Sequence, residues 1–71
     1  MIELPDIEQV SADVHKAWME SKRAMGIISR KSEEGEELMV PYEFLSEKAK
    51  EIDRNTVKAV YDAIIRRQSN S

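Results

Sequence analysis

The 71-residue chain contains no cysteine, so neither a disulfide framework nor a thiolate metal site can support its fold. It has no apolar run longer than a few residues, and its N-terminus lacks the basic and then apolar pattern of a secretory signal. We therefore predict a protein that does not span a membrane and that resides in the cytoplasm.

Clustered positive charge is also scarce. The chain carries 11 basic and 14 acidic residues, a formal net charge of −3, and the two signs are mixed along it. Nucleic-acid binding usually needs a basic face that neutralises phosphates. The basic pairs Arg30-Lys31 and Arg66-Arg67 are too small for such a face, so we do not expect a nucleic-acid partner.

The sequence lacks the usual motifs of catalysis and of metal or cofactor binding. His15 is the only histidine, and no serine, cysteine or carboxylate stands at a spacing that makes a dyad or triad with it. The acidic run within residues 29–37 has no aspartate, unlike a calcium loop. We therefore predict no enzyme activity, no metal and no cofactor. We expect His15 to be structural, for example bonding a backbone carbonyl in the loop, with a general base as the alternative.

What the chain does have is apolar residues at steps of three and four, the spacing that gathers side chains on one helix face. A first helix is predicted from residue 7 to about residue 25. Asp6 can cap its start, with Gln9 three residues on, and Gly26 can close its end in the left-handed conformation. Its apolar stripe is centred on Trp18 and consists of Ile7, Val10, Val14, Ala17, Trp18, Ser21 and Met25.

A second helix is predicted from its cap at Ser46 to about Arg67. Asp53 and Asn55 are weak helix formers in its middle, where they allow a bend. Its apolar positions are Leu45, Ala49, Ile52, Thr56, Val60, Ala63 and Ile64, widened by Val57 and Tyr61. This helix is the element expected to cover Trp18.

Between the two helices, residues 29–37 are almost wholly polar and predict a mobile surface loop. The stretch 38–41 is expected to be extended and residues 42–45 to form one tight helical turn. Ile27-Ile28 can pair with Leu38-Met39-Val40 as a minimal ribbon. The tail at 68–71 is expected to fray.

Together these segments predict a single all-α domain over residues 1–71, with its core at about 7–65. Its architecture is an antiparallel helical pair, two long helices plus a short helical turn, with an irregular or ribbon-like connection. A chain this short buries only ~60% of the surface that its unfolded form exposes. Its stability is therefore marginal unless a partner or ligand contributes.

Trp18 is the strongest candidate for a binding residue, although a tryptophan in so small a domain is more often simply a core residue. As a binding residue, it would stack on a planar ligand, with His15 one helical turn away. We place Tyr42, Lys48 and Arg54 at the same rim, which would suit an aromatic ligand with negative charge. A binding module leaves Trp18 partly accessible to solvent, whereas a structural module seals it.

Several short motifs, taken in order, resemble the ryanodine-receptor repeat. They are Val14-His15-Lys16-Ala17-Trp18, Gly26, Leu38-Met39-Val40-Pro41-Tyr42, Leu45-Ser46-Glu47-Lys48 and Asp53-Arg54. The resemblance covers residues 7 to 65, nearly all of the chain. It has two departures: Ile27 stands where the family often has a second tryptophan, and Arg66-Arg67 replaces the usual Leu-Gly-Tyr ending.

The resemblance implies a non-enzymatic ligand-binding module similar to the stand-alone copies of bacteria and phages. Those copies are suggested to sense nucleotide-like ligands in signalling or defence. In the calcium-release channels the repeats lie on the cytoplasmic periphery, so the resemblance implies no channel activity. It carries His15, Trp18 and Tyr42 over as candidate binding residues.

The family's repeats pair in tandem, and this chain holds one, which implies pairing with a second copy about a two-fold axis. Val57, Tyr61 and Ile65, beyond the main stripe, are the residues expected on that surface. The alternative function is a structural module that assembles with itself or with another protein and binds no small molecule.

Overall fold

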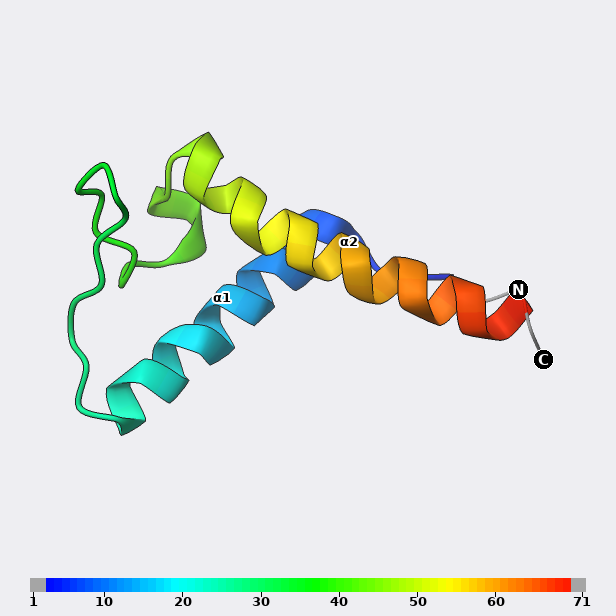
Figure 1. The fold of residues 1–71 in the computed structure, drawn as a ribbon, viewed down its shortest axis with the longest axis horizontal. Helices are drawn as coiled ribbons and strands as arrows, with labels where there is room; N and C mark the ends of the chain where they lie inside the picture. Colours follow the sequence, from blue (N-terminus) through cyan, green and yellow to red (C-terminus); the bar gives the residue numbers. More distant parts are fainter. Residues whose placement is uncertain (1–2, 70–71) are drawn as a thin grey trace.

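The computed structural model describes residues 3–69. The described chain consists of two long helices, α1 (Ile7–Ala24) and α2 (Glu47–Ser69), and a single turn of 3-10 helix, η1 (Tyr42–Phe44). The start of α1 lies near the middle of α2, and the helices diverge from there toward the connection, so that they form a V (Figure 1). The predicted all-α helical pair with a short helical turn is confirmed.

The ends of α1 follow from local sequence. The Asp6 carboxylate accepts a hydrogen bond from the Gln9 N–H at 3.2 Å and caps the first turn. At the other end Gly26 has a φ of +83°, and the Ile27 N–H donates to the Lys22 carbonyl at 2.9 Å. A glycine takes this conformation at little steric cost, so it closes the helix as predicted.

The helix α2 is longer than predicted and unbroken. The Ser46 hydroxyl accepts a hydrogen bond from the Ala49 N–H at 3.2 Å, which confirms the expected cap. The helix continues through Asp53 without interruption, and the Asp53 carboxylate contacts His15 of α1. Of the tail predicted to fray, residues 68 and 69 continue α2, whereas residues 70 and 71 lie outside the described part.

The connection contains a minimal ribbon, but not at the predicted position. Lys31 and Glu37 form an isolated antiparallel bridge. Beside it the Leu38 N–H donates to the Arg30 carbonyl at 2.7 Å. The pairing therefore lies next to the turn at 32–36 instead of at Ile27-Ile28, since a short turn brings only its immediate flanks together.

Two glutamates of the polar stretch 29–37 accept several hydrogen bonds each. Glu37 accepts hydrogen bonds from the Ser29 hydroxyl and from two backbone N–H groups. Glu36 accepts from the hydroxyl and the backbone N–H of Ser46, at 2.6 and 2.8 Å. These bonds to the charged forms lower the pKa of both glutamates, those to Ser46 and Ser29 contributing most. The mobility of this loop remains a prediction.

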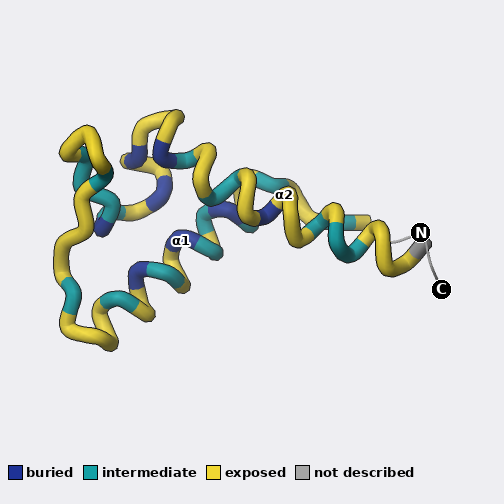
Figure 2. The backbone as a smooth tube through the Cα atoms, in the orientation of Figure 1, coloured by how far each residue is buried: buried dark blue, intermediate teal, exposed yellow. Residues whose placement is uncertain are grey.

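The buried face of α1 is rotated relative to the predicted stripe. Its buried residues are Ser11, His15 and Met19, spaced four apart. Trp18, the expected centre, is half-buried, and Met25 at the end of the stripe is 66% exposed. Because the helices diverge toward the connection, α2 does not cover the last turn of α1 (Figures 1 and 2).

The core lies where η1 and the first half of α2 meet α1, and residues 58–68 of α2 are exposed or half-buried (Figure 2). The main cluster consists of Tyr42, Leu45 and Ala49, packed against Ala12, Leu38 and Val40. Val57 is 2% exposed, so its expected place on a pairing surface is wrong. Tyr61 donates a hydrogen bond to the Pro5 carbonyl at 2.9 Å, while Ile65 is 54% exposed.

Candidate functional site

A hollow of about 280 Å³ lies between α1, α2 and the connection. Val14 and Trp18 of α1 and Ile52 of α2 contribute apolar walls. Asp53 and Thr56 add polar atoms from α2, and His15 adds its ring from α1. A concave surface that is mostly apolar, with a few converging polar groups, is typical of small-molecule sites.

His15 is the residue that ties the walls of the hollow together. Its side chain is 5% exposed, with Nε2 at 2.8 Å from the Val40 carbonyl oxygen and Nδ1 at 3.1 Å from Asp53 Oδ2. One ring thus joins α1, the connection and α2. The bond to the Val40 carbonyl is a contact of the expected kind, although Val40 lies in the stretch 38–41 and not in the loop at 29–37. The structural role of His15 stays a prediction.

The His15–Asp53 contact needs a proton of its own. A carbonyl oxygen can only accept, so Nε2 must carry a hydrogen toward Val40. Nδ1 and Oδ2 would repel one another if both presented lone pairs, so a second proton lies on one of them. Burial raises the pKa of Asp53 above its ordinary value, and the neighbouring His15 offsets part of that rise.

Trp18 is half-buried and lines the hollow. Its ring stacks loosely on His15, with centroids 5.4 Å apart and planes inclined by 27°. The Lys22 ammonium lies 6.0 Å from the centroid of the Trp18 ring, one helical turn further along α1. The indole therefore has neighbours along its own helix but is not sealed by α2.

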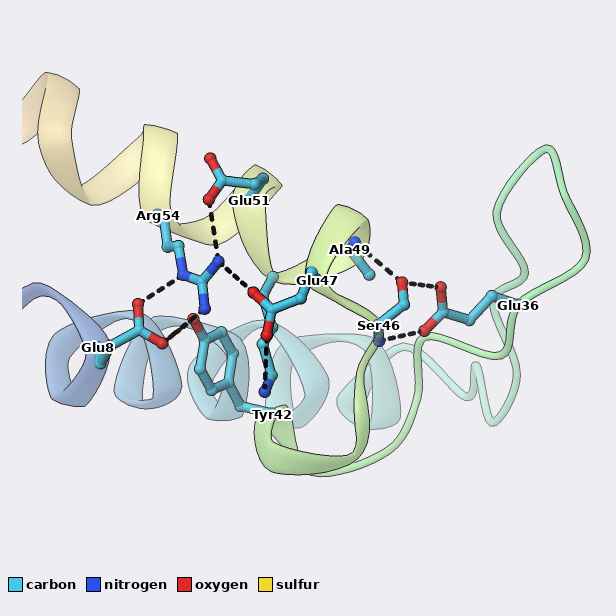
Figure 3. Close-up of polar contacts among 9 residues, drawn as sticks. Glu8, Glu36, Tyr42, Ser46, Glu47, Ala49, Glu51 and Arg54 are labelled. Atoms are coloured by element: carbon cyan, nitrogen blue, oxygen red, sulfur yellow. Dashed lines mark hydrogen bonds and ion pairs between the residues drawn. The ribbon is translucent and has the colours of Figure 1, made fainter.

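Arg54 lies in a clamp between the helices and does not line the hollow (Figure 3). Its guanidinium donates to both oxygens of Glu8, Nε to Oε2 at 2.5 Å and Nη2 to Oε1 at 2.8 Å. Its Nη1 donates to Glu47 and Glu51 at 2.8 and 2.9 Å. The Tyr42 hydroxyl donates to Glu8 at 3.1 Å. The bonds to Glu8 and then to the other two glutamates raise the pKa of Arg54, and Arg54 lowers the pKa of Glu8.

The five residues predicted for the rim therefore separate. The three rings gather, since His15 lies between Trp18 and Tyr42, with a centroid distance of 6.4 Å to Tyr42. The two cations do not join them. Lys48 is 75% exposed and pairs with Glu34 of the loop, at a different hollow from the one beside Trp18.

Asp53 is the ionisable residue of the hollow that is missing from the predicted site residues. In the sequence Asp53 stands out only as a weak helix former and as part of a motif, yet its carboxylate faces His15. Its position in the sequence is the signal that points to a buried site. Asp53 falls four residues after Ala49 and four before Val57, so an acidic side chain stands in the buried face of a helix and needs a partner.

Comparisons with protein family models, with curated proteins and with solved structures find no match to this chain. Across residues 3–69, no helix is long and apolar enough to cross a membrane. In that same part of the chain, no three histidine, cysteine, aspartate or glutamate side chains are grouped so that they could hold a metal ion.

Proposed function

We propose that this chain is a non-enzymatic, cytoplasmic module of the ryanodine-receptor-repeat type, similar to stand-alone bacterial or phage copies. In this proposal it binds a small planar ligand, such as a nucleotide derivative, in the hollow beside Trp18. The supporting observation is that Trp18 is half-buried and lines an open hollow, where a purely structural tryptophan would be sealed.

The ring of the ligand would supply most of the affinity. Stacking on an aromatic side chain contributes roughly 1–3 kcal/mol per base, and the apolar walls add contact area. Such a site supports dissociation constants from micromolar to millimolar. Lys48 and Arg54 are paired with glutamates, so the phosphates of a nucleotide would lie outside the hollow and add little.

The test is a titration with purine nucleosides, cyclic nucleotides and dinucleotides. Trp18 is the only tryptophan, so its fluorescence reports on the hollow without interference, and the melting temperature gives a second readout. We expect a saturable change in both with at least one member of the panel. No response to any member would contradict the proposal.

A matched pair of variants places the site. Ile52→Glu inserts a charge into an apolar wall of the hollow, whereas Val60→Glu makes the same kind of change on α2 outside the lining residues. Both side chains are more than half exposed, so both variants should fold. Loss of binding in the first alone supports the proposed site, and equal loss or equal retention places it elsewhere.

A second candidate function is self-assembly or docking to another protein. It is favoured by exposed apolar side chains on α2, namely Ile52, Val60 and Ile65 at 60%, 52% and 54%, and by the extension of α2 beyond α1 (Figure 1). Light scattering distinguishes it: a dimer at micromolar concentration supports the structural function. A monomer at high micromolar concentration removes self-assembly and leaves docking to another protein as the remaining form of this function.

A further inference from the structure

The hollow is short of positive charge. Among the described residues that line it, no lysine or arginine is present, and the only ionisable groups are His15 and Asp53. Lys22, whose ammonium lies over the Trp18 ring, is not part of the lining. Whichever partner carries the shared proton, the His15–Asp53 pair is neutral overall, so an anionic ligand finds no free cation in the lining to pair with.

The polar atoms left over in the hollow are hydrogen-bond acceptors. Asp53 uses Oδ2 toward His15, and no described residue forms a hydrogen bond to its Oδ1. Its side chain is 15% exposed and lines the hollow. The Thr56 hydroxyl donates its hydrogen to the Ile52 carbonyl at 3.0 Å, which leaves the lone pairs of Oγ1 to accept.

His15 offers no free donor to balance these acceptors. Both of its ring nitrogens are engaged, one with Val40 and one with Asp53. A ligand that brings its own N–H groups is therefore complementary to the hollow, because it satisfies acceptors in a mostly apolar surrounding where each hydrogen bond is strong. A ligand that brings acceptors would leave its own acceptors and those of the hollow without hydrogen bonds.

We infer that the hollow selects an aromatic ring with an edge of two adjacent N–H donors, the pattern of an aryl amidine or of a guanine base. In this arrangement the ring contacts Trp18 and the edge donates to Asp53. The inference rests on the proposed function and adds to it the chemical class of the ligand: a donor edge, cationic or neutral, and not a phosphate.

Three isosteric probes test this on the unaltered chain: benzamidine, benzamide and benzoate, titrated separately while the Trp18 fluorescence is followed. They have the same ring and nearly the same shape but present a cationic donor edge, a mixed edge and an anionic acceptor edge. We expect benzamidine to bind about tenfold more tightly than benzoate, with benzamide between them, since charge-assisted hydrogen bonds to a carboxylate favour the first. Guanosine distinguishes a neutral donor edge from a cationic one. If its affinity equals that of benzamidine, the neutral pair of donors suffices. If its affinity is weaker, the positive charge is needed.

The outcomes separate the two proposals. Equal affinity for the three probes, or tighter binding of benzoate, overturns the donor-edge inference and leaves ligand binding in the hollow intact. Failure of every probe and of the nucleoside panel to bind overturns both. Because this comparison uses the unaltered chain, it does not depend on the folding of a variant.

Matched substitutions then identify the acceptor. Asp53→Asn should reduce the preference for benzamidine over benzamide to within about twofold, because an amide no longer favours a cation. Asp62→Asn, an exposed position of the same helix outside the hollow, should leave the preference unchanged. Thr56→Val keeps the side-chain shape without the hydroxyl and should weaken benzamidine binding a few-fold. An Asp53→Asn chain that melts cooperatively and retains the full preference would show that Asp53 is not the acceptor.

Discussion

His15 and Asp53 hold the two helices together across 38 residues of sequence, through a contact of 3.1 Å between Nδ1 and Oδ2. The same ring bonds the Val40 carbonyl through Nε2. Each nitrogen of one imidazole is thus assigned to a different segment of the chain. This makes His15, more than the half-buried Trp18, the residue on which the arrangement of the hollow depends.

Removing the imidazole should destabilise the fold strongly. His15→Ala leaves the Val40 carbonyl and a mostly buried Asp53 without their partner, and one such loss costs about 1–3 kcal/mol. We expect a drop of about 2–3 kcal/mol in the free energy of unfolding, measured by urea titration with Trp18 fluorescence. Lys16→Ala, next to it but exposed, should change it by less than ~0.5 kcal/mol. An unchanged urea midpoint for His15→Ala would show that the bridge contributes nothing.

Trp18→Ala should cost less than the roughly 3–5 kcal/mol usual for a fully buried large aromatic, because its side chain is only half-buried. Val57 is smaller but 2% exposed, and its truncation leaves a cavity. We expect Val57→Ala to lower the melting temperature by at least as much as Trp18→Ala. Circular dichroism melts of the two variants give the comparison. A far larger loss for Trp18→Ala would mean that the indole is the true centre of the core.

Ser11 carries a hydroxyl that is fully buried and has no hydrogen-bond partner within residues 3–69. Ser11→Ala removes this unsatisfied group and should raise the free energy of unfolding by about 1 kcal/mol. Ser21→Ala is the control: it lies exposed on the same helix and reports only the higher helix propensity of alanine, about 0.5 kcal/mol. The gain at Ser11 should exceed that at Ser21, and the reverse order would show that the hydroxyl is satisfied in solution.

Acid should weaken the fold through its glutamates. The bonds from Ser29 and from backbone N–H groups lower the pKa of Glu37 below 4.5 in the folded state. The stability that they contribute is present above that pH and is lost as the pH falls through the lowered pKa. We expect the melting temperature to fall between about pH 5 and pH 3. Glu37→Gln should flatten part of this fall, and Glu43→Gln, at an exposed position, should not.

Asp53 acts in the opposite direction over the same range. Burial raises its pKa above 3.8, so the stability linked to its protonation is present at low pH and is lost as the pH rises through the folded value. Asp53→Asn should therefore make the melting temperature fall more steeply on acidification than in the parent chain. If the melting temperatures of the parent and of Asp53→Asn change in parallel with pH, the pKa of Asp53 is the same in the folded and unfolded states.

Much of the secondary structure was determined by the sequence alone, because its signals act within a few residues. Asp6 and Ser46 cap the next turn of chain, and Gly26 closes α1 through its own backbone conformation. The apolar spacing predicts helices in both long segments for the same local reason. The contact of His15 with a backbone carbonyl was also foreseeable, since a lone histidine beside an apolar stripe needs a partner.

Only the tertiary structure decided which edge of each broad stripe is buried and which charges meet. The crossing of the helices places Ser11 and His15 inside and leaves Trp18 at a half-open hollow, a choice that helical spacing does not contain. Arg54 could be assigned to a ligand from sequence, but Glu8 lies 46 residues away and occupies it in the folded chain. Ion pairs and burial depend on distances between segments, and those distances exist only once the two helices have packed.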